Sequence, residues 1–134
     1  MIEFDIRNGI LYSVTSGAQQ NIILPKNVEA IWFDAFSGCS NVVTITVNDG
    51  VKYIKGGAFL ECASLKQIYI PESVNKIHVF NDQYINDCSL ANCKGGFSEF
   101  RNASEGFEVI CKKDSLAEKY CIHFSIPFRY INFD

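Results

Sequence analysis

A repeat of 23 residues limits what this chain can fold into more than any other feature of its sequence. Residues 22–44 read IILPKNVEAIWFDAFSGCSNVVT and residues 45–67 read ITVNDGVKYIKGGAFLECASLKQ, with no gap between the two copies. A third copy opens at residue 68 as IYIPESVNKI and then drifts. There, residues 84–88 stand three positions later than residues 58–62 would predict, after an insertion around residues 80–82. Self-similarity at a fixed period of this size is typical of solenoids and other repeat folds.

Each copy carries apolar residues that one coil of chain cannot bury by itself. Residues 45–47 (ITV) and 68–70 (IYI) alternate like a short strand with one buried face, and residues 48–50 (NDG) or Pro71 then turn the chain. Coils that stack on one another bury these residues against their neighbours, so the core becomes a set of columns of like side chains. The expected columns are Ile22, Ile45 and Ile68; Val28, Val51 and Val74; Ile31, Ile54 and Ile77; Phe36 and Phe59; and Cys39 and Cys62.

Both ends of the chain predict caps, because the open end of a solenoid exposes core residues and unpaired strand edges. Residues 4–6 and 10–14, separated by a turn at Asn8-Gly9, predict a hairpin at the N-terminal end. At the C-terminal end we expect a strand over 107–111, a short helix and a last strand over 126–131. Asp114 or Ser115 can begin that helix, since Ser115 stands at capping-box spacing from Glu118. The apolar face of the helix is expected to hold Leu116, Ala117, Tyr120 and Cys121.

The sequence therefore predicts one domain over residues 1–134. It divides into an N-terminal cap in 1–21, repeats in 22–90 with the third irregular, and a C-terminal cap in 91–134. Residues 89–106 have no assigned place, and a long loop there would be unusual for a compact domain.

The repeat resembles a known family. The run I-x-I-P-x-x-V-x-x-I-x-x-x-A-F-x-x-C-x-x-L is similar to the BspA-type (Treponema pallidum-type) leucine-rich repeat, over about residues 9 to 90. The resemblance implies a strand-rich α/β fold: a right-handed solenoid with parallel strands, as in surface and secreted proteins of bacteria and some protozoa. It also implies that the protein acts by binding and not by catalysis.

Composition excludes several classes of protein. Hydrophobic residues make up 48% of the chain and the net charge is only −3, which argues against disorder and against a basic nucleic-acid-binding face. No apolar run approaches the roughly 20 residues of a membrane-spanning helix, so we expect no membrane insertion. The first five residues show no signal peptide, which favours the cytoplasm, whereas the family resemblance favours the cell surface.

Six cysteines and two histidines are the candidates for a thiol or metal site. The spacing lacks the C-x-x-C pairs of common zinc sites, and a metal or cofactor is not expected. Cys121 and His123 match the arrangement of a cysteine hydrolase too poorly to predict an enzyme. Cys39 and Cys62 stand at equivalent positions of the repeat, so we expect them to be buried free thiols. A small thiol or zinc protein remains a remote alternative, built from Cys88, Cys93, Cys111, Cys121, His78 and His123.

Side chains that point away from the core form the candidate binding surface. Solenoids bind partners with such columns, and exposed aromatic residues are enriched at interfaces. The expected outward columns are Asn21, Thr44 and Gln67; Ile23, Thr46 and Tyr69; Ala30, Tyr53 and Lys76; and Trp32, Lys55 and His78. The predicted partner-binding residues are Tyr69, Thr46, Gln67, Trp32, Lys55, Tyr53 and Lys76.

We therefore interpret the chain as a non-catalytic leucine-rich-repeat module that binds a protein or a surface glycan. A structural or self-associating spacer within a larger bacterial surface protein is the alternative.

Overall fold

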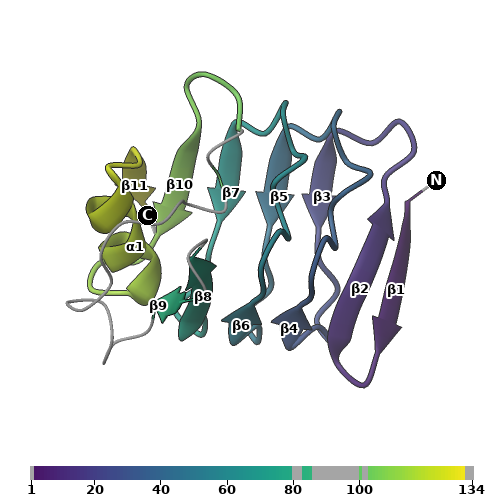
Figure 1. Ribbon diagram of the computed structural model, residues 1–134, viewed down its shortest axis with the longest axis horizontal. Coiled ribbons are helices and arrows are strands. Elements are labelled where there is room, and N and C mark those ends of the chain that lie inside the picture. The colour runs from purple at the N-terminus through teal and green to yellow at the C-terminus, as the bar shows by residue number, and fades with distance from the viewer. Residues whose placement is uncertain (1, 80–82, 86–99, 101–102, 132–134) are drawn as a thin grey trace.

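The computed structural model of the chain describes residues 2–79, 83–85, 100 and 103–131, and its strands form the two walls of a solenoid (Figure 1). The first wall is a six-stranded sheet in the order β1 Glu3–Arg7, β2 Ile10–Thr15, β4 Ala30–Ile31, β6 Tyr53–Ile54, β8 Lys76–Val79 and β9 Gln83–Ile85. The second is a five-stranded sheet in the order β11 Phe128–Tyr130, β10 Glu108–Cys111, β7 Gln67–Tyr69, β5 Thr44–Thr46 and β3 Asn21–Ile23. The single helix of the described residues, α1 Leu116–Phe124, lies near the C-terminal end.

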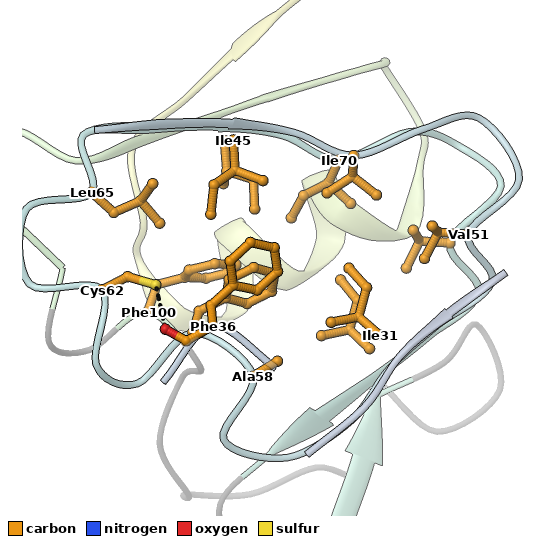
Figure 2. Packing of buried hydrophobic residues seen from close by; sticks show 14 of the residues in the cluster. Ile31, Phe36, Ile45, Val51, Ala58, Cys62, Leu65, Ile70 and Phe100 are labelled. Atoms are coloured by element: carbon orange, nitrogen blue, oxygen red, sulfur yellow. Dashed lines mark hydrogen bonds between the residues drawn. The ribbon is translucent and has the colours of Figure 1, made fainter. Parts of the chain in front are cut away.

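The coils stack in the predicted register. Ile22, Ile45 and Ile68 pair across β3, β5 and β7 of the five-stranded sheet, whose strands are all parallel. On the other wall, β4, β6 and β8 pair in the same 23-residue steps. Every residue of the five predicted core columns is at most 1% exposed, so the core columns and the solenoid fold are confirmed. Figure 2 looks along this core, with Ile45 and Ile70 on one wall and Ile31 on the other.

The third coil closes at Phe100, which the sequence did not predict. The Phe36 and Phe59 rings stack at 5.1 Å between centroids, and the Phe59 and Phe100 rings stack at the same distance (Figure 2). The backbone turn repeats as well: Ala103 N–H donates to the Phe100 carbonyl, as Cys62 N–H donates to the Phe59 carbonyl. Phe100 therefore takes the third position in the phenylalanine column.

The third coil is longer than the others by a fixed number of residues. Thr44 pairs with Gln67 after 23 residues, whereas Gln67 pairs with Glu108 after 41, an excess of 18. The excess follows β8, where β9 pairs antiparallel with β8 and Tyr84 stands opposite His78 in the strand register. The placement of residues 84–88 as the third Ala-Phe-x-x-Cys copy is therefore wrong for Tyr84 and Ile85, and Cys88 lies outside the described residues.

The N-terminal hairpin is confirmed and covers the first coil. Asn8 and Gly9 both have positive φ, at 52° and 79°, which the two-residue turn between β1 and β2 requires. Ile2, Phe4 and Ile6 pack against the core, so β1 shields apolar residues that the first coil would otherwise expose.

The C-terminal strand–helix–strand cap is confirmed too. The Ser115 Oγ accepts a hydrogen bond from Glu118 N–H at 3.3 Å, and Glu118 Oε1 accepts one from Asp114 N–H at 3.1 Å. These bonds satisfy backbone donors at the start of α1, as a capping box does. The predicted apolar face, Leu116, Ala117, Tyr120 and Cys121, is buried. The last strand, β11, pairs parallel with β10 and is shorter than the expected 126–131.

No helix among the residues that the structure describes has the length and apolar character to cross a membrane.

Candidate functional site

The predicted binding residues lie on two different walls of the solenoid. Tyr69, Thr46 and Gln67 belong to the five-stranded sheet, in β5 and β7. Tyr53 and Lys76 belong to the six-stranded sheet, in β6 and β8, while Trp32 and Lys55 directly follow β4 and β6. The residues that the sequence grouped into one surface therefore form two separate surfaces.

On the six-stranded sheet, Lys55 contacts aromatic side chains from two coils. Its Nζ lies 3.9 Å from the centroid of the Trp32 ring, 4.9 Å from that of Phe33 and 5.2 Å from that of Tyr53. The Tyr12 ring lies 6.0 Å from the Trp32 ring, centroid to centroid. We call Tyr12, Trp32, Phe33, Tyr53 and Lys55 the aromatic–cationic cluster.

Two more cations extend the cluster at its ends. The Arg7 guanidinium carbon lies 4.0 Å from the centroid of the Tyr12 ring, and Lys76 Nζ lies 5.0 Å from that of Tyr53. Contacts between cations and rings, or between two rings, thus form a continuous row from Arg7 on β1 to Lys76 on β8. Asp5 is a nearby acid, and it forms an exposed ion pair with Arg7 at 3.3 Å.

The strand register explains why these side chains meet. Leu11, Ile31 and Ile54 form one inward row across β2, β4 and β6, so the residue after each of them points outward. Backbone bonds hold these next residues in place: Trp32 N–H donates to the Leu11 carbonyl at 3.0 Å, and Lys55 N–H donates to the Ile31 carbonyl at 2.8 Å. Adjacent strands lie about 4.8 Å apart, which brings neighbouring outward side chains into contact.

The cluster is ordered before any partner arrives. Cation–π contacts at exposed sites stabilise a pair by about 0.5–1 kcal/mol each, and Lys55 makes several at once. Trp32, Tyr53 and Lys55 are half-buried, whereas Phe33 is 48% exposed. The surface therefore offers large apolar rings whose rotamers are already restricted.

On the five-stranded sheet, a groove opens above Thr46. Ile23, Thr46 and Tyr69 pair in register on β3, β5 and β7, and the small threonine stands between two large side chains. The groove has a volume of about 350 Å³, and we call it the Thr46 groove. It is lined by Ile23, Leu24, Lys26, Thr46, Val47, Asn48, Asp49 and Tyr69.

Tyr69 is fixed as one wall of the Thr46 groove. Its Oη lies 3.3 Å from Asp49 Oδ1. Burial, and then the charge of Asp49, raises the pKa of Tyr69 to about 12, so the phenol keeps its proton and donates it in this bond. Gln67, by contrast, donates from Nε2 to Glu108 Oε1, which also pairs with Arg129 at 2.8 Å. Gln67 therefore belongs to a polar row within the sheet, beside the groove.

The thiols described by the structure are buried. Cys39, Cys62, Cys111 and Cys121 are free and 0% exposed, and the Cys62 Sγ donates to the Phe36 carbonyl at 3.8 Å (Figure 2). Burial raises the pKa of Cys62 and of Cys121 to about 12, which disfavours the reactive thiolate.

The other predicted thiol and metal ligands do not gather into a site. Within the described ranges, no three His, Cys, Asp or Glu side chains lie together as metal ligands would. His123 packs edge-on against the Phe124 ring at 4.7 Å, and His78 pairs across β8 and β9 with Tyr84. Cys88 and Cys93 lie outside the described residues.

A comparison with protein families decides the class of this solenoid. The family described as the BspA type leucine-rich repeat region (6 copies) matches residues 6–104, which is more than half of the chain. The chain belongs to this family. No curated protein matches the chain, and no solved structure matches it. BspA-type leucine-rich repeats form repeat modules, typically for protein interaction, and such solenoids are generally not catalytic.

The family match extends beyond the repeats that the sequence made evident. It begins at residue 6, within β1, and ends at residue 104, past the Phe100 turn. Several residues of the two surfaces were not predicted from the sequence. They lie in the N-terminal hairpin or close to residues that were predicted. Tyr12 and Arg7 come from the hairpin, Phe33 follows Trp32, and Asp49 lies in the turn after Thr46. Extending the outward column of Trp32 and Lys55 by one 23-residue step leads to Gly9, because β2 and β4 pair at an offset of 20, so the period could not have found Tyr12.

Proposed function

We propose that this BspA-type leucine-rich-repeat solenoid is a non-catalytic interaction module that binds a protein partner through the aromatic–cationic cluster. The observation that carries the proposal is the position of Lys55 over three rings from two coils, on the outward side of a sheet. The family supports interaction as the general role.

The chemistry of the cluster matches that of protein interfaces. Tyrosine, tryptophan and arginine are the residues most enriched among side chains that dominate binding energy. Here Tyr12, Trp32, Tyr53 and Arg7 lie on one sheet, and the cation contacts already order the rings. The side chains of the cluster then lose less conformational entropy when the complex forms than flexible side chains would.

The charge of the cluster predicts the charge of the partner. The chain has a net charge of −3, yet the cluster carries Lys55, and its ends carry Lys76 and Arg7, of which Arg7 is already paired with Asp5. Complementary charges steer association and suppress wrong partners. We therefore expect acidic residues on the partner around an apolar centre that covers Trp32.

Alanine at Trp32, Tyr53 and Lys55 together tests the proposal. Proteins captured by the immobilised chain from an extract of the cells that produce it are identified, purified and titrated by calorimetry. We expect the triple variant to bind at least about tenfold more weakly, since it removes several dominant side chains.

The matched control is a triple alanine variant of the other sheet, at Thr46, Gln67 and Tyr69, which should bind the partner as the wild type does. Equal weakening by both variants would contradict the assignment to the six-stranded sheet. A solution mass that rises with concentration, with no captured partner, would favour the self-associating spacer instead.

A further inference from the structure

The Thr46 groove has a shape that the rest of its sheet does not explain. Ile23 and Tyr69 lie two strands apart, which separates their backbones by about 10 Å, and Thr46 between them leaves the space unfilled. Ile23 is 72% exposed although it is apolar. The volume of about 350 Å³ lies at the small end of ligand sites, so the groove suits a ligand about the size of one ring.

The apolar walls of the groove suit the flat side of a ring that carries C–H groups. Tyr69 presents an aromatic ring that is held by its bond to Asp49. The face of an aromatic ring is electron-rich, so it attracts weakly positive C–H groups that lie against it. Ile23 closes the opposite side with an aliphatic surface.

The polar groups at the end of the groove both donate and accept hydrogen bonds. Lys26 can only donate, the Asp49 carboxylate can only accept, and the Thr46 hydroxyl can do both. The opposite charges of Lys26 and Asp49 disfavour a strongly charged ligand, because an anion would meet Asp49 and a cation would meet Lys26. A neutral ligand with several hydroxyls satisfies both residues.

Asn48, which also lines the groove, is held in place by its own hydrogen bonds. Its Nδ2 donates to the Val28 carbonyl at 2.8 Å and to the Lys26 carbonyl at 3.4 Å, which fixes the amide. Its Oδ1 is buried and has no hydrogen-bond donor in the described part of the chain. Because this oxygen is closed off from solvent, a ligand in the groove does not reach it, and the polar groups that the groove offers to a ligand are those of Lys26, Thr46 and Asp49.

We propose that the Thr46 groove binds one sugar ring, as a free sugar or as the terminal unit of a glycan. The ring lies with its C–H face on Tyr69, and its hydroxyls bond to Asp49, Thr46 and Lys26. This site is separate from the aromatic–cationic cluster, because it lies on the other sheet.

Saturation-transfer NMR tests the proposal with the methyl glycosides of glucose, galactose, mannose and N-acetylglucosamine as probes, and with trisaccharides that end in the same sugars. At least one glycoside should receive saturation from the protein, most strongly at its ring C–H protons. A trisaccharide that binds more tightly than its glycoside indicates a glycan as the source, and equal binding indicates a free sugar. If no sugar receives saturation, or if leucine as an amino-acid probe binds in their place, the proposal fails.

Two variants and one matched control locate the binding. Tyr69→Ala removes a wall and should weaken sugar binding about tenfold, whereas Tyr53→Ala, a tyrosine of the other sheet, should leave it within about twofold. Thr46→Phe fills the groove from an exposed position and should abolish binding while the circular dichroism spectrum stays that of the wild type. Sugar binding that survives Thr46→Phe would overturn the site. The sugar-binding site and the protein-binding cluster lie on different sheets. The sugar-binding proposal can therefore fail while the protein-binding proposal holds, and the reverse.

Discussion

At the scale of single residues, the core depends on side chains that repeat from coil to coil. Phe59 lies in the middle of the phenylalanine column, with the Phe36 ring on one side and the Phe100 ring on the other, each at 5.1 Å. Phe107 stacks on Phe100 and continues the column toward the C-terminal cap. A residue in this position contacts both neighbouring coils, so its loss affects more than its own repeat.

Phe59→Ala should lower the free energy of unfolding by about 3–5 kcal/mol, because it leaves a cavity between two stacked rings. Urea denaturation followed by circular dichroism measures the change. Phe33→Ala is the control, since Phe33 is 48% exposed, and it should cost far less. If both variants unfold at the same urea concentration, Phe59 does not have the central place that the ring distances give it.

The buried thiols predict how stability depends on pH. Burial raises the pKa of Cys62 from 9.0 to about 12, so the unfolded chain loses this proton at a lower pH than the folded chain does. The stabilisation is therefore complete below pH 9 and is lost as the pH rises toward 12. Thermal unfolding midpoints from pH 9 upward should fall more steeply for the wild type than for Cys62→Ala. Parallel pH curves for the two proteins would contradict this.

At the scale of elements, the sequence predicted whatever follows the 23-residue period. The core columns rest on this period, whereas the hairpin turn at Asn8-Gly9 and the helix start at Asp114 or Ser115 rest on local patterns. All are confirmed, with Ser115 as the N-cap. Phe100 could not be placed by the period, because 18 extra residues separate it from the position that the period expects. The stacking of its ring on Phe59 can be seen only in three dimensions.

The candidate binding site, too, could be predicted from the sequence only in part. Outward columns follow from strand alternation, so the side-by-side order of Tyr53 and Lys76 and of Trp32 and Lys55 could be predicted. The separation of these four residues from Thr46, Gln67 and Tyr69, which lie on the other sheet, could not be predicted, because it depends on where each coil turns. The left-handed residue before each Ala-Phe pair, Asp34 with φ of 55° and Gly57 with φ of 78°, marks one such turn.

The register of the third coil predicts that its extra residues can be removed. When residues 80–99 are replaced by Gly-Ala, Phe100 stands five residues after Ile77, as Phe59 does after Ile54. The glycine supplies the positive φ found at Asp34 and Gly57. This variant should unfold cooperatively with a midpoint near that of the wild type, as measured by differential scanning calorimetry.

The matched control for this deletion is the same replacement with one more residue, Gly-Ala-Ala, which shifts Phe100 out of register. It should be clearly less stable, because the ring column and the pairing of β7 with β10 no longer coincide. Equal stability of the two replacements would show that register does not hold the third coil together.

At the scale of the whole molecule, the solenoid carries two chemically different surfaces on its two walls. The six-stranded sheet presents cations and large rings, whereas the five-stranded sheet presents a small groove with both charges at its end. A stack of coils keeps the walls apart through a rigid core, so each wall can be altered without the other. This separation is what allows the protein-binding and sugar-binding proposals to be tested independently.

The single tryptophan of the chain, Trp32, lies at the centre of the aromatic–cationic cluster and gives the most direct test of the proposed protein binding. Its indole N–H gives one signal in a two-dimensional ¹H–¹⁵N NMR spectrum. As the purified partner is added, this signal should shift or broaden and reach saturation together with the calorimetric titration, while the backbone amide signal of Thr46 in the same spectrum stays in place. A partner that saturates the chain by calorimetry and leaves the Trp32 indole signal unmoved would contradict the account.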